Sequence, residues 1–196
     1  MTTFLNPGDE VLIPDPAYLA YPACVSIAGG KPVLVPTYAE NEFKLTVDEL
    51  EKKVTPKTKA ILIGYPNNPT GTIMEREELL GIADFAQKHD LIVISDEIYC
   101  DLTYEGQHTC FASLPDMQER TIVLNGFSKS YAMTGLRIGY VCAPREALEE
   151  IYKVHQYEIL CASTTSQYGA IEALRNCDDD VKAMFEEYAA RREMRS

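Results

Sequence analysis

The stretch TIVLNGFSKSYAMTGLRIGY, residues 121–140, sets the pattern that decides the fold. It opens with a β-branched apolar run, which is typical of a buried strand. Small and polar residues follow at once, and among them is one lysine, Lys129, while Arg137 opens the next apolar run. A surface lysine needs no such setting, whereas an amine that must reach a bound carbonyl group does. The stretch therefore predicts a strand that ends at a functional site.

The same alternation extends over the rest of the chain. Helical patterns such as TVDELEKKV (46–54), which opens with a threonine N-cap, and EREELLGIADFAQKHD (75–90) separate the apolar runs. Near-continuous apolar strands are buried on both faces, and strands that alternate with helices form parallel sheets. The sequence thus predicts an α/β fold, three layers (α/β/α) around a mostly parallel sheet. The expected strands are EVLIPDP (10–16), KPVLVPT (31–37), AILIGYP (60–66), LIVISDEIY (91–99), TIVLNGF (121–127) and RIGYVCAP (137–144).

The composition excludes several classes of protein. The formal net charge of −12 argues against a nucleic-acid or anionic-membrane surface, since both need clustered Lys and Arg. The apolar runs are far shorter than a membrane span, and the N-terminus has no basic segment followed by an apolar one, so no signal peptide is predicted. The six cysteines form no CxxC pair and have no histidine at metal-ligand spacing. We therefore expect a cytoplasmic protein with no metal site, with reduced, mostly buried thiols and with structural or surface histidines.

Both ends of the chain look cut. Met1 to Leu5 resembles the tail of a helix, and DDDVKAMFEEYAARREMRS (178–196) is a helical pattern that no Gly or Pro ends. We therefore expect a fragment of a larger protein.

Polar and aromatic side chains follow the ends of the expected strands. In open α/β sheets, ligands bind beyond the carboxyl ends of the strands. The segments found there supply an aromatic plate, an amide, a carboxylate, a phenol, an amine and a guanidinium, and they are DPAY (15–18), NNPTG (67–71), DEIY (96–99), Ser128, Lys129 and Arg137. Such a set would suit a planar, phosphorylated heterocycle that carries a carbonyl group.

Five motifs in this order, PDPAY, YPNNPTG, SDEIY, NGFSK and TGLRIGY, resemble those of the fold-type I aminotransferases that depend on pyridoxal 5′-phosphate. The likeness is greater to the class I/II branch, which includes bacterial aromatic-amino-acid and N-acetyl-diaminopimelate aminotransferases, and it covers essentially the whole chain. It implies that residues 1–176 form a cofactor-binding large domain that is N-terminally incomplete. Residues 177–196 would then begin the helix that leads to a small domain, which is largely absent.

The resemblance assigns the central chemistry to two charged residues. Lys129 matches the lysine that forms a Schiff base with the cofactor, and such a lysine must be partly neutral to act as a nucleophile. Asp96 matches the aspartate that pairs with the pyridine nitrogen and keeps its proton in place, which deepens the electron sink. Glu97 is the competing carboxylate next door, and the family pattern assigns the role to the first of the two.

Three further matches concern the ring of the cofactor. Tyr99 matches the phenol that hydrogen-bonds the 3′-oxygen. Asn68 matches the amide that shares this oxygen and reaches the substrate carboxylate, and its bond to Pro69 is a candidate cis peptide. Tyr18 matches the aromatic residue that stacks on the ring face, although Tyr21 lies one helical turn further on and could be confused with it.

The phosphate group would be held by Arg137, because a guanidinium offers a planar fork of donors. Gly126 departs from the family pattern, since many relatives carry a Ser or Thr hydroxyl there, and Ser128 is the alternative donor. The rest of the phosphate cradle, a tyrosine lent across the dimer and the arginine that grips the substrate α-carboxylate would lie outside this chain.

The function that the resemblance implies is transamination. The full-length enzyme, built as a homodimer, would transfer an amino group between an amino acid and a 2-oxo acid through the Schiff base on Lys129. A C–S β-lyase is the enzymatic alternative, because it shares the fold, the cofactor and these residues. A non-enzymatic sensor domain of a bacterial regulator is the alternative from another class, and the fragment alone could be inert. The sequence does not name the amino acid.

Overall fold

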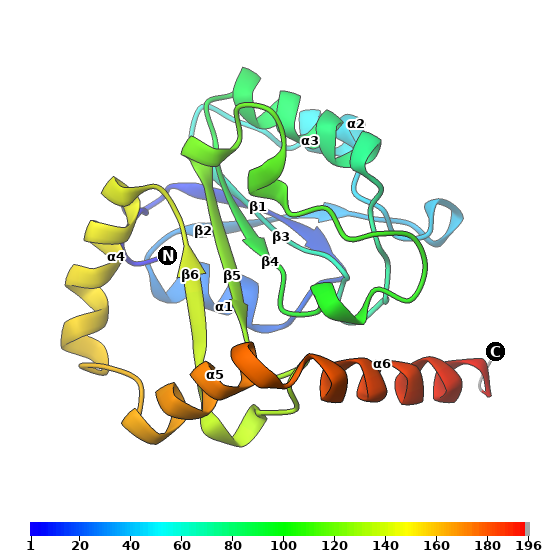
Figure 1. Cartoon of the computed structure of the whole chain (residues 1–196). Helices are drawn as coiled ribbons and strands as arrows, with labels where there is room; N and C mark the ends of the chain where they lie inside the picture. Colours follow the sequence, from blue (N-terminus) through cyan, green and yellow to red (C-terminus); the bar gives the residue numbers. More distant parts are fainter. Residues whose placement is uncertain (195–196) are drawn as a thin grey trace.

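Six strands form one sheet in the computed structural model, which describes residues 1–194 (Figure 1). Their order across the sheet is β2-β1-β3-β4-β5-β6, in which the first five are parallel and β6 is antiparallel to β5. All six expected strands are present, and the mostly parallel sheet is confirmed. Their bounds are β1 Glu10–Asp15, β2 Lys31–Pro36, β3 Thr58–Gly64, β4 Ile92–Asp96, β5 Thr121–Gly126 and β6 Gly139–Cys142.

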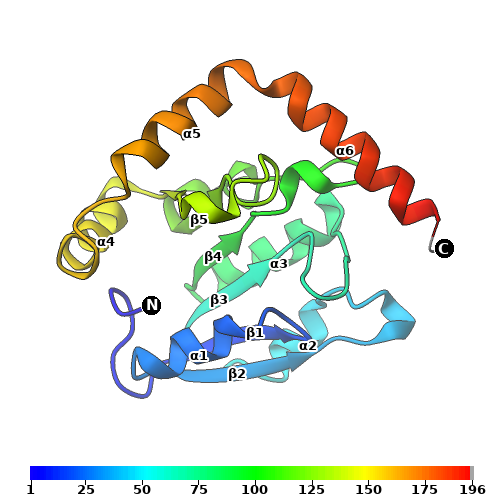
Figure 2. The same cartoon turned by 90° about the horizontal axis from the view of Figure 1, so that it is seen from below.

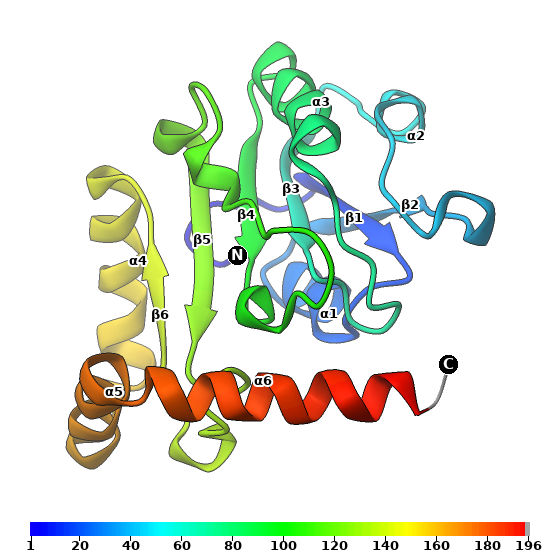
Figure 3. The ribbon, with the colours of Figure 1, turned by 45° about the vertical axis from the view of Figure 1, so that its right-hand side comes forward.

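Helices cover both faces of this sheet (Figure 3). Side chains alternate along the strands between two cores: in β3, Ile61 and Ile63 point into one and Leu62 into the other. The first core is completed by α2 (Val47–Glu51) and α3 (Arg76–Lys88), and the second by α1 (Ala20–Ile27) and α4 (Arg145–Glu158). The predicted three-layer α/β/α fold is therefore confirmed, and its strands read as continuous apolar runs because both faces are buried.

The helix starts follow the expected local chemistry. The Thr46 hydroxyl accepts the backbone N–H of Glu49 at 3.4 Å and so caps α2, as predicted. The helix ends at Glu51, however, three residues before the end of the stretch expected to be helical. At the N-terminus, Met1 to Leu5 form a turn in which the N–H groups of Phe4 and Leu5 share the Met1 carbonyl oxygen, and the Leu5 bond has the spacing of an α-helix, so the expected helix tail stays a prediction.

Two C-terminal helices, α5 (Thr164–Asn176) and α6 (Asp178–Glu193), lie beyond the carboxyl ends of the parallel strands (Figures 1 and 2). In α5, the Ser166 hydroxyl donates to the Leu136 carbonyl oxygen at 2.6 Å. In α6, the Phe185 ring lies 5.3 Å from that of Tyr104, in the loop after β4. The helix expected near the C-terminus is thus confirmed up to Glu193, while residues 195–196 lie outside the described part.

The expectation of mostly buried thiols is wrong. All six cysteines are free, but none is buried, and Cys24, Cys142 and Cys161 are exposed. Cys24 lies on α1, Cys142 on the edge strand β6 and Cys161 in the loop after α4. Separately, no helix within residues 1–194 combines the length and the apolar character needed to cross a membrane.

Strands β5 and β6 approach closely at Gly126 and Gly139, which are direct partners in the antiparallel ladder. A Cβ atom on Gly126 would lie 2.9 Å from the Cα of Gly139 and 3.1 Å from the carbonyl oxygen of Ile138. Both distances are to backbone, which cannot move aside as a side chain can. The chain therefore has no room at position 126 for a side chain, including the Ser or Thr hydroxyl that the family pattern suggests there.

We expect Gly126→Ala to destabilise the full-length protein by about 1–3 kcal/mol, the usual cost of forcing an extra methyl group into a packed site. Denaturant unfolding measures this loss. The matched control is Gly135→Ala, because a Cβ there would meet no atom within 4 Å. Equal effects of the two substitutions would contradict the close-approach explanation.

Candidate active site

The register of the parallel strands brings the predicted site residues together. Gly64 of β3 is the partner of Asp96 in β4, and Asp96 is the partner of Leu124 in β5. The loops that follow these strands therefore start side by side and border a cavity of about 360 Å³. All seven predicted residues line it, namely Tyr18, Asn68, Asp96, Tyr99, Ser128, Lys129 and Arg137.

Asp96 presents a carboxylate to this cavity from the last position of β4. Its Oδ1 accepts the backbone N–H of Ile98 at 3.2 Å, and its Oδ2 accepts the hydroxyl of Tyr21 at 2.9 Å. Burial raises the pKa of Asp96 above its usual value, against the opposing effect of these two hydrogen bonds. A cationic partner would stabilise the charged form of such a carboxylate, and a protonated pyridine ring would be a partner of this kind.

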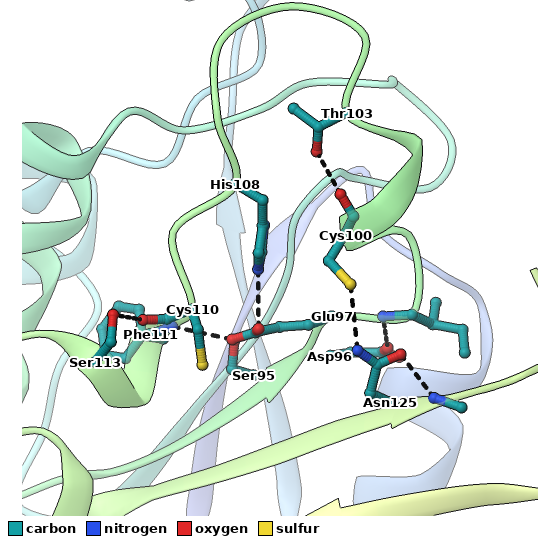
Figure 4. A network of polar contacts seen from close by, with 12 residues as sticks. Ser95, Asp96, Glu97, Cys100, Thr103, His108, Cys110, Phe111, Ser113 and Asn125 are labelled. Carbon is teal, nitrogen blue, oxygen red and sulfur yellow. Dashed lines mark hydrogen bonds and ion pairs between the residues drawn. The ribbon is translucent and has the colours of Figure 1, made fainter. Parts of the chain in front are cut away.

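Glu97, the competing carboxylate, does not line the cavity and is buried on the other side of the strand end (Figure 4). It accepts the Ser95 hydroxyl at 3.0 Å and the Phe111 N–H at 3.0 Å, and it pairs with His108 Nε2 at 2.9 Å. Burial alone would raise the pKa of Glu97, but these contacts, of which the His108 hydrogen bond is the largest, hold it below its usual value. Glu97 and His108 thus brace the loop that carries Tyr99.

Lys129 and Tyr99 meet inside the cavity. The Nζ atom of Lys129 lies 5.5 Å from the centroid of the Tyr99 ring. The turn before the lysine is held by Asn125, whose side-chain oxygen accepts the Gly126 N–H at 2.7 Å and whose amide donates to Cys100 Sγ at 3.3 Å (Figure 4). The amine and the phenol are therefore presented by two braced loops.

Asn67 and its neighbour Asn68 have different positions, one within the loop and one at the cavity. The side-chain oxygen of Asn67 accepts the N–H and the hydroxyl of Thr70, at 3.3 and 3.0 Å, and so holds the loop. Asn68 lines the cavity, and its bond to Pro69 is cis, as predicted; the Asp15–Pro16 and Tyr65–Pro66 bonds are cis as well.

Tyr18 and Tyr21 stand at the start of α1 with their rings edge to face, 5.6 Å apart and at 85°. Tyr18 is 48% exposed, so its ring is available to a ligand in the cavity. Tyr21 is less exposed, and its hydroxyl donates a hydrogen bond to Asp96. The structure therefore distinguishes the two tyrosines, which the sequence does not.

Arg137 lies two residues before β6, whereas the sequence suggested that it opens the strand. Its backbone is left-handed (φ 50°, ψ 51°), a conformation that cannot continue into an extended strand, so β6 begins at Gly139. Its Nη1 donates to the Thr134 carbonyl oxygen at 2.9 Å, and the side chain lines the cavity.

The cavity has further lining residues to which sequence reasoning assigned no role of their own, and these are Tyr21, Pro66, Ile98, Leu124, Asn125 and Thr134. Only Tyr21 and Asn125 carried a signal, since one lies a helical turn beyond an aromatic candidate and the other ends a strand. A second cavity of about 520 Å³ adjoins the first at Asn68 and Tyr99. Its far side includes Arg192 of α6, which forms an ion pair with Glu105 at 2.5 Å.

The first cavity fits pyridoxal 5′-phosphate in size and in chemistry. Pockets for small molecules and cofactors range from about 300 to 1,000 Å³, and they are lined by aromatic side chains and a few placed polar groups. Here a half-exposed ring, a partly buried carboxylate, a phenol, an amide, an amine and a guanidinium line one space.

Comparisons with known proteins point to one family. The family model "Aminotransferase class I and II" matches residues 1–195. The aspartate aminotransferase of Pyrococcus abyssi is 51% identical over 99% of this chain and 51% of its own length. For aromatic-amino-acid aminotransferase 2 of Thermococcus litoralis the identity is 49%, over 99% of this chain and 51% of the relative. The solved aromatic aminotransferase of Pyrococcus horikoshii superposes with a TM-score of 0.96 at 49% identity, covering 98% of this chain and 52% of that one. This chain thus spans about half the length of these relatives.

We expect Glu97→Gln to destabilise the full-length protein by about 1–3 kcal/mol near neutral pH, because it removes a buried charged acceptor. The pKa of Glu97 in the folded protein lies below the usual 4.5, so its contribution is complete above pH 4.5 and is lost as the pH falls through the lower, folded-state pKa. The difference between wild type and variant should therefore shrink in that acidic range. Unfolding midpoints measured against pH test this.

The control for this experiment is Ser113→Ala, which removes an exposed hydrogen bond to the Cys110 carbonyl oxygen further along the chain. We expect a change of only a few tenths of a kcal/mol, independent of pH. A Glu97→Gln effect that stays constant across the acidic range would contradict the assignment of a charged, paired Glu97.

Proposed function

We propose that the whole protein transfers an amino group between an amino acid and a 2-oxo acid. The chain belongs to the class I and II aminotransferase family, whose members are pyridoxal 5′-phosphate enzymes. The observation that carries the proposal is the convergence of Lys129, Asp96 and Arg137 on one cavity with Tyr99 and Asn68. The C–S lyase and sensor alternatives gain no support from the relatives above, whose names are all those of aminotransferases.

In this proposal, the chain's own residues fix the cofactor at its ring and at its phosphate. Asp96 pairs with the ring nitrogen, Tyr99 and Asn68 donate to the 3′-oxygen, and Tyr18 stacks on the ring face. Arg137 and Ser128 donate to the phosphate, with Arg137 as a planar fork of N–H groups. When bound, the cofactor supplies an electron sink for the negative charge that develops on the substrate Cα.

Lys129 has two tasks in the proposed reaction. Its amine would anchor the cofactor covalently at the aldehyde carbon, with loss of water. Once the substrate amine has taken its place on that carbon, the freed Lys129 amine would accept the proton from the substrate Cα. Positioned acid–base catalysis of this kind contributes about 10²–10⁴-fold to the rate. The nearby Tyr99 ring, 5.5 Å from Nζ, helps to keep the amine inside the cavity.

We propose that the substrate binds where the two cavities meet. Asn68 lines both, so its amide could donate to a substrate carboxylate while the cofactor occupies the first cavity. The relatives at 51% and 49% identity are named for aspartate and for aromatic amino acids, which differ in side-chain charge. The proposal therefore stays with an amino acid and a 2-oxo acid as the substrate classes.

The proposal extends to the organisation of the protein. Residues 1–176 would be the cofactor domain, the segment 177–196 would lead to a second domain, and the whole protein would act as a cytoplasmic homodimer. The exposed apolar side chains around the α4–α5 connection support a covering partner, since Tyr157 and Leu160 are 86% and 80% exposed. Sedimentation of the whole protein tests the dimer.

Lys129 can be tested by trapping the cofactor. We expect borohydride reduction of the full-length protein with pyridoxal 5′-phosphate, followed by digestion and mass spectrometry, to place the pyridoxyl label on Lys129. The Lys129→Ala variant should lose the label and at least about 10²-fold in turnover. Lys153→Ala, which removes an exposed lysine paired with Glu150 on α4, should keep both. Label spread over surface lysines, or wild-type turnover in Lys129→Ala, would refute the proposal.

Arg137 can be tested by retention of the cofactor. We expect Arg137→Lys to bind pyridoxal 5′-phosphate more weakly, because an ammonium group cannot reproduce the planar, two-point grip of a guanidinium on phosphate. Dialysis against cofactor-free buffer, followed by absorbance, measures the loss. The exposed Arg145, paired with Glu149 at 2.8 Å on α4, gives the matched control Arg145→Lys. Equal retention in both variants would count against the phosphate role.

A further inference from the structure

Tyr21 reaches the partly buried carboxylate of Asp96 from a different element of the fold. Its hydroxyl, carried by α1, donates to Oδ2 at 2.9 Å, while the backbone N–H of Ile98 donates to Oδ1 at 3.2 Å. Each carboxylate oxygen thus accepts one of these two hydrogen bonds, and the two donors lie on separate segments. Rotation of the carboxylate would break both bonds, so this pair fixes its orientation in the cavity.

Gly64 makes room for the Tyr21 hydroxyl. A Cβ atom on Gly64 would lie 2.5 Å from Tyr21 Oη but 3.4 Å from Cζ and 3.5 Å from Cε2, so only the hydroxyl would clash. The φ of Gly64 lies outside the left-handed region, so the backbone there does not require glycine. Gly64 is also the sheet partner of Asp96, which places the missing Cβ next to the hydrogen bond itself.

The charges around Asp96 make Tyr21 a permanent donor. Burial and the charge of Asp96 raise the pKa of Tyr21 above its usual value, so its hydroxyl keeps its proton. Tyr99 and Lys129 line the same cavity, and Glu97 adjoins Asp96 in the chain but is engaged by His108. Tyr21 is thus the side-chain group whose hydrogen bond stabilises the anionic form of Asp96.

We propose that Tyr21 is a positioning residue that holds the Asp96 carboxylate in the orientation and charge state needed to pair with the cofactor ring nitrogen, and that Gly64 is a glycine because it seats the Tyr21 hydroxyl. This inference rests on the proposed function. Without the hydroxyl, the anionic carboxylate loses a donor, and the proton shared with the ring nitrogen moves toward Asp96.

The test follows the ring nitrogen directly. Full-length protein and its Tyr21→Phe variant are loaded with cofactor that carries ¹⁵N in the ring, and the ¹⁵N chemical shift is recorded against pH. We expect a protonated ring nitrogen in the wild type and a shift toward the unprotonated position in the variant. The dissociation constant of the cofactor should rise about tenfold, since hydrogen bonds to charged groups have this weight.

Gly64→Ala completes a double-mutant cycle. In the wild-type background its methyl group displaces the hydroxyl and should reproduce both effects of Tyr21→Phe. In the Tyr21→Phe background it should add little, because the remaining ring atoms lie at ordinary contact distance, 3.4 and 3.5 Å. Thermal unfolding of the cofactor-free proteins shows whether each variant is folded. If one of the two single variants does not fold, the other single variant provides the test.

The outcomes separate the inference from the proposed function. If wild-type protein does not bind the cofactor at Lys129, the proposed function fails, and the inference with it. If it binds with a protonated ring nitrogen that Tyr21→Phe leaves unchanged, the role of Tyr21 is overturned while the proposed function stands. Additive effects of Tyr21→Phe and Gly64→Ala would overturn the seating role of Gly64.

Discussion

The pairing of Gly64, Asp96 and Leu124 across three parallel strands is the constraint on which the site depends. Parallel strands in register bring their carboxyl ends to one edge, so loops that are distant in the sequence begin next to one another. The register in turn depends on the two cores, because a slip by one residue would exchange the side chains that fill them. The position of Asp96 against Lys129 is therefore set by apolar packing that involves neither residue.

The end of β4 shows how adjacent charges are kept apart in function. Asp96 and Glu97 follow one another, and both are acidic, yet their environments shift their pKa values in opposite directions. Burial dominates at Asp96, which has two donors, whereas hydrogen bonds dominate at Glu97, which has His108, Ser95 and Phe111. A cationic partner would therefore stabilise the charged form of Asp96, whereas the hydrogen bonds of Glu97 hold its loop in place.

Much of the fold could be predicted because strands buried on both faces leave a direct trace in the sequence, as AILIG and LIVIS do. The seven residues that line the cavity could be collected because six of them stand at or after the ends of such strands and Arg137 stands just before the last one. The hydrogen bond from Tyr21 to Asp96 could not, since it joins residues 75 positions apart and depends on the distance between α1 and β4. The same holds for the backbone of Arg137, whose left-handed conformation carries no signature in the residue type.

Two glycines, Gly64 and Gly126, also depend on contacts between distant segments. Neither has a backbone conformation that demands glycine, and each is explained by an atom of another segment that a Cβ would strike. At Gly64 that atom is a side-chain hydroxyl, so the glycine preserves a polar contact. At Gly126 it is the backbone of β6, so the glycine allows the edge strand to pair closely at the cost of a possible phosphate donor. The phosphate end of the proposed site therefore relies on Arg137 and Ser128, which lie on either side of Lys129 in the same stretch of chain.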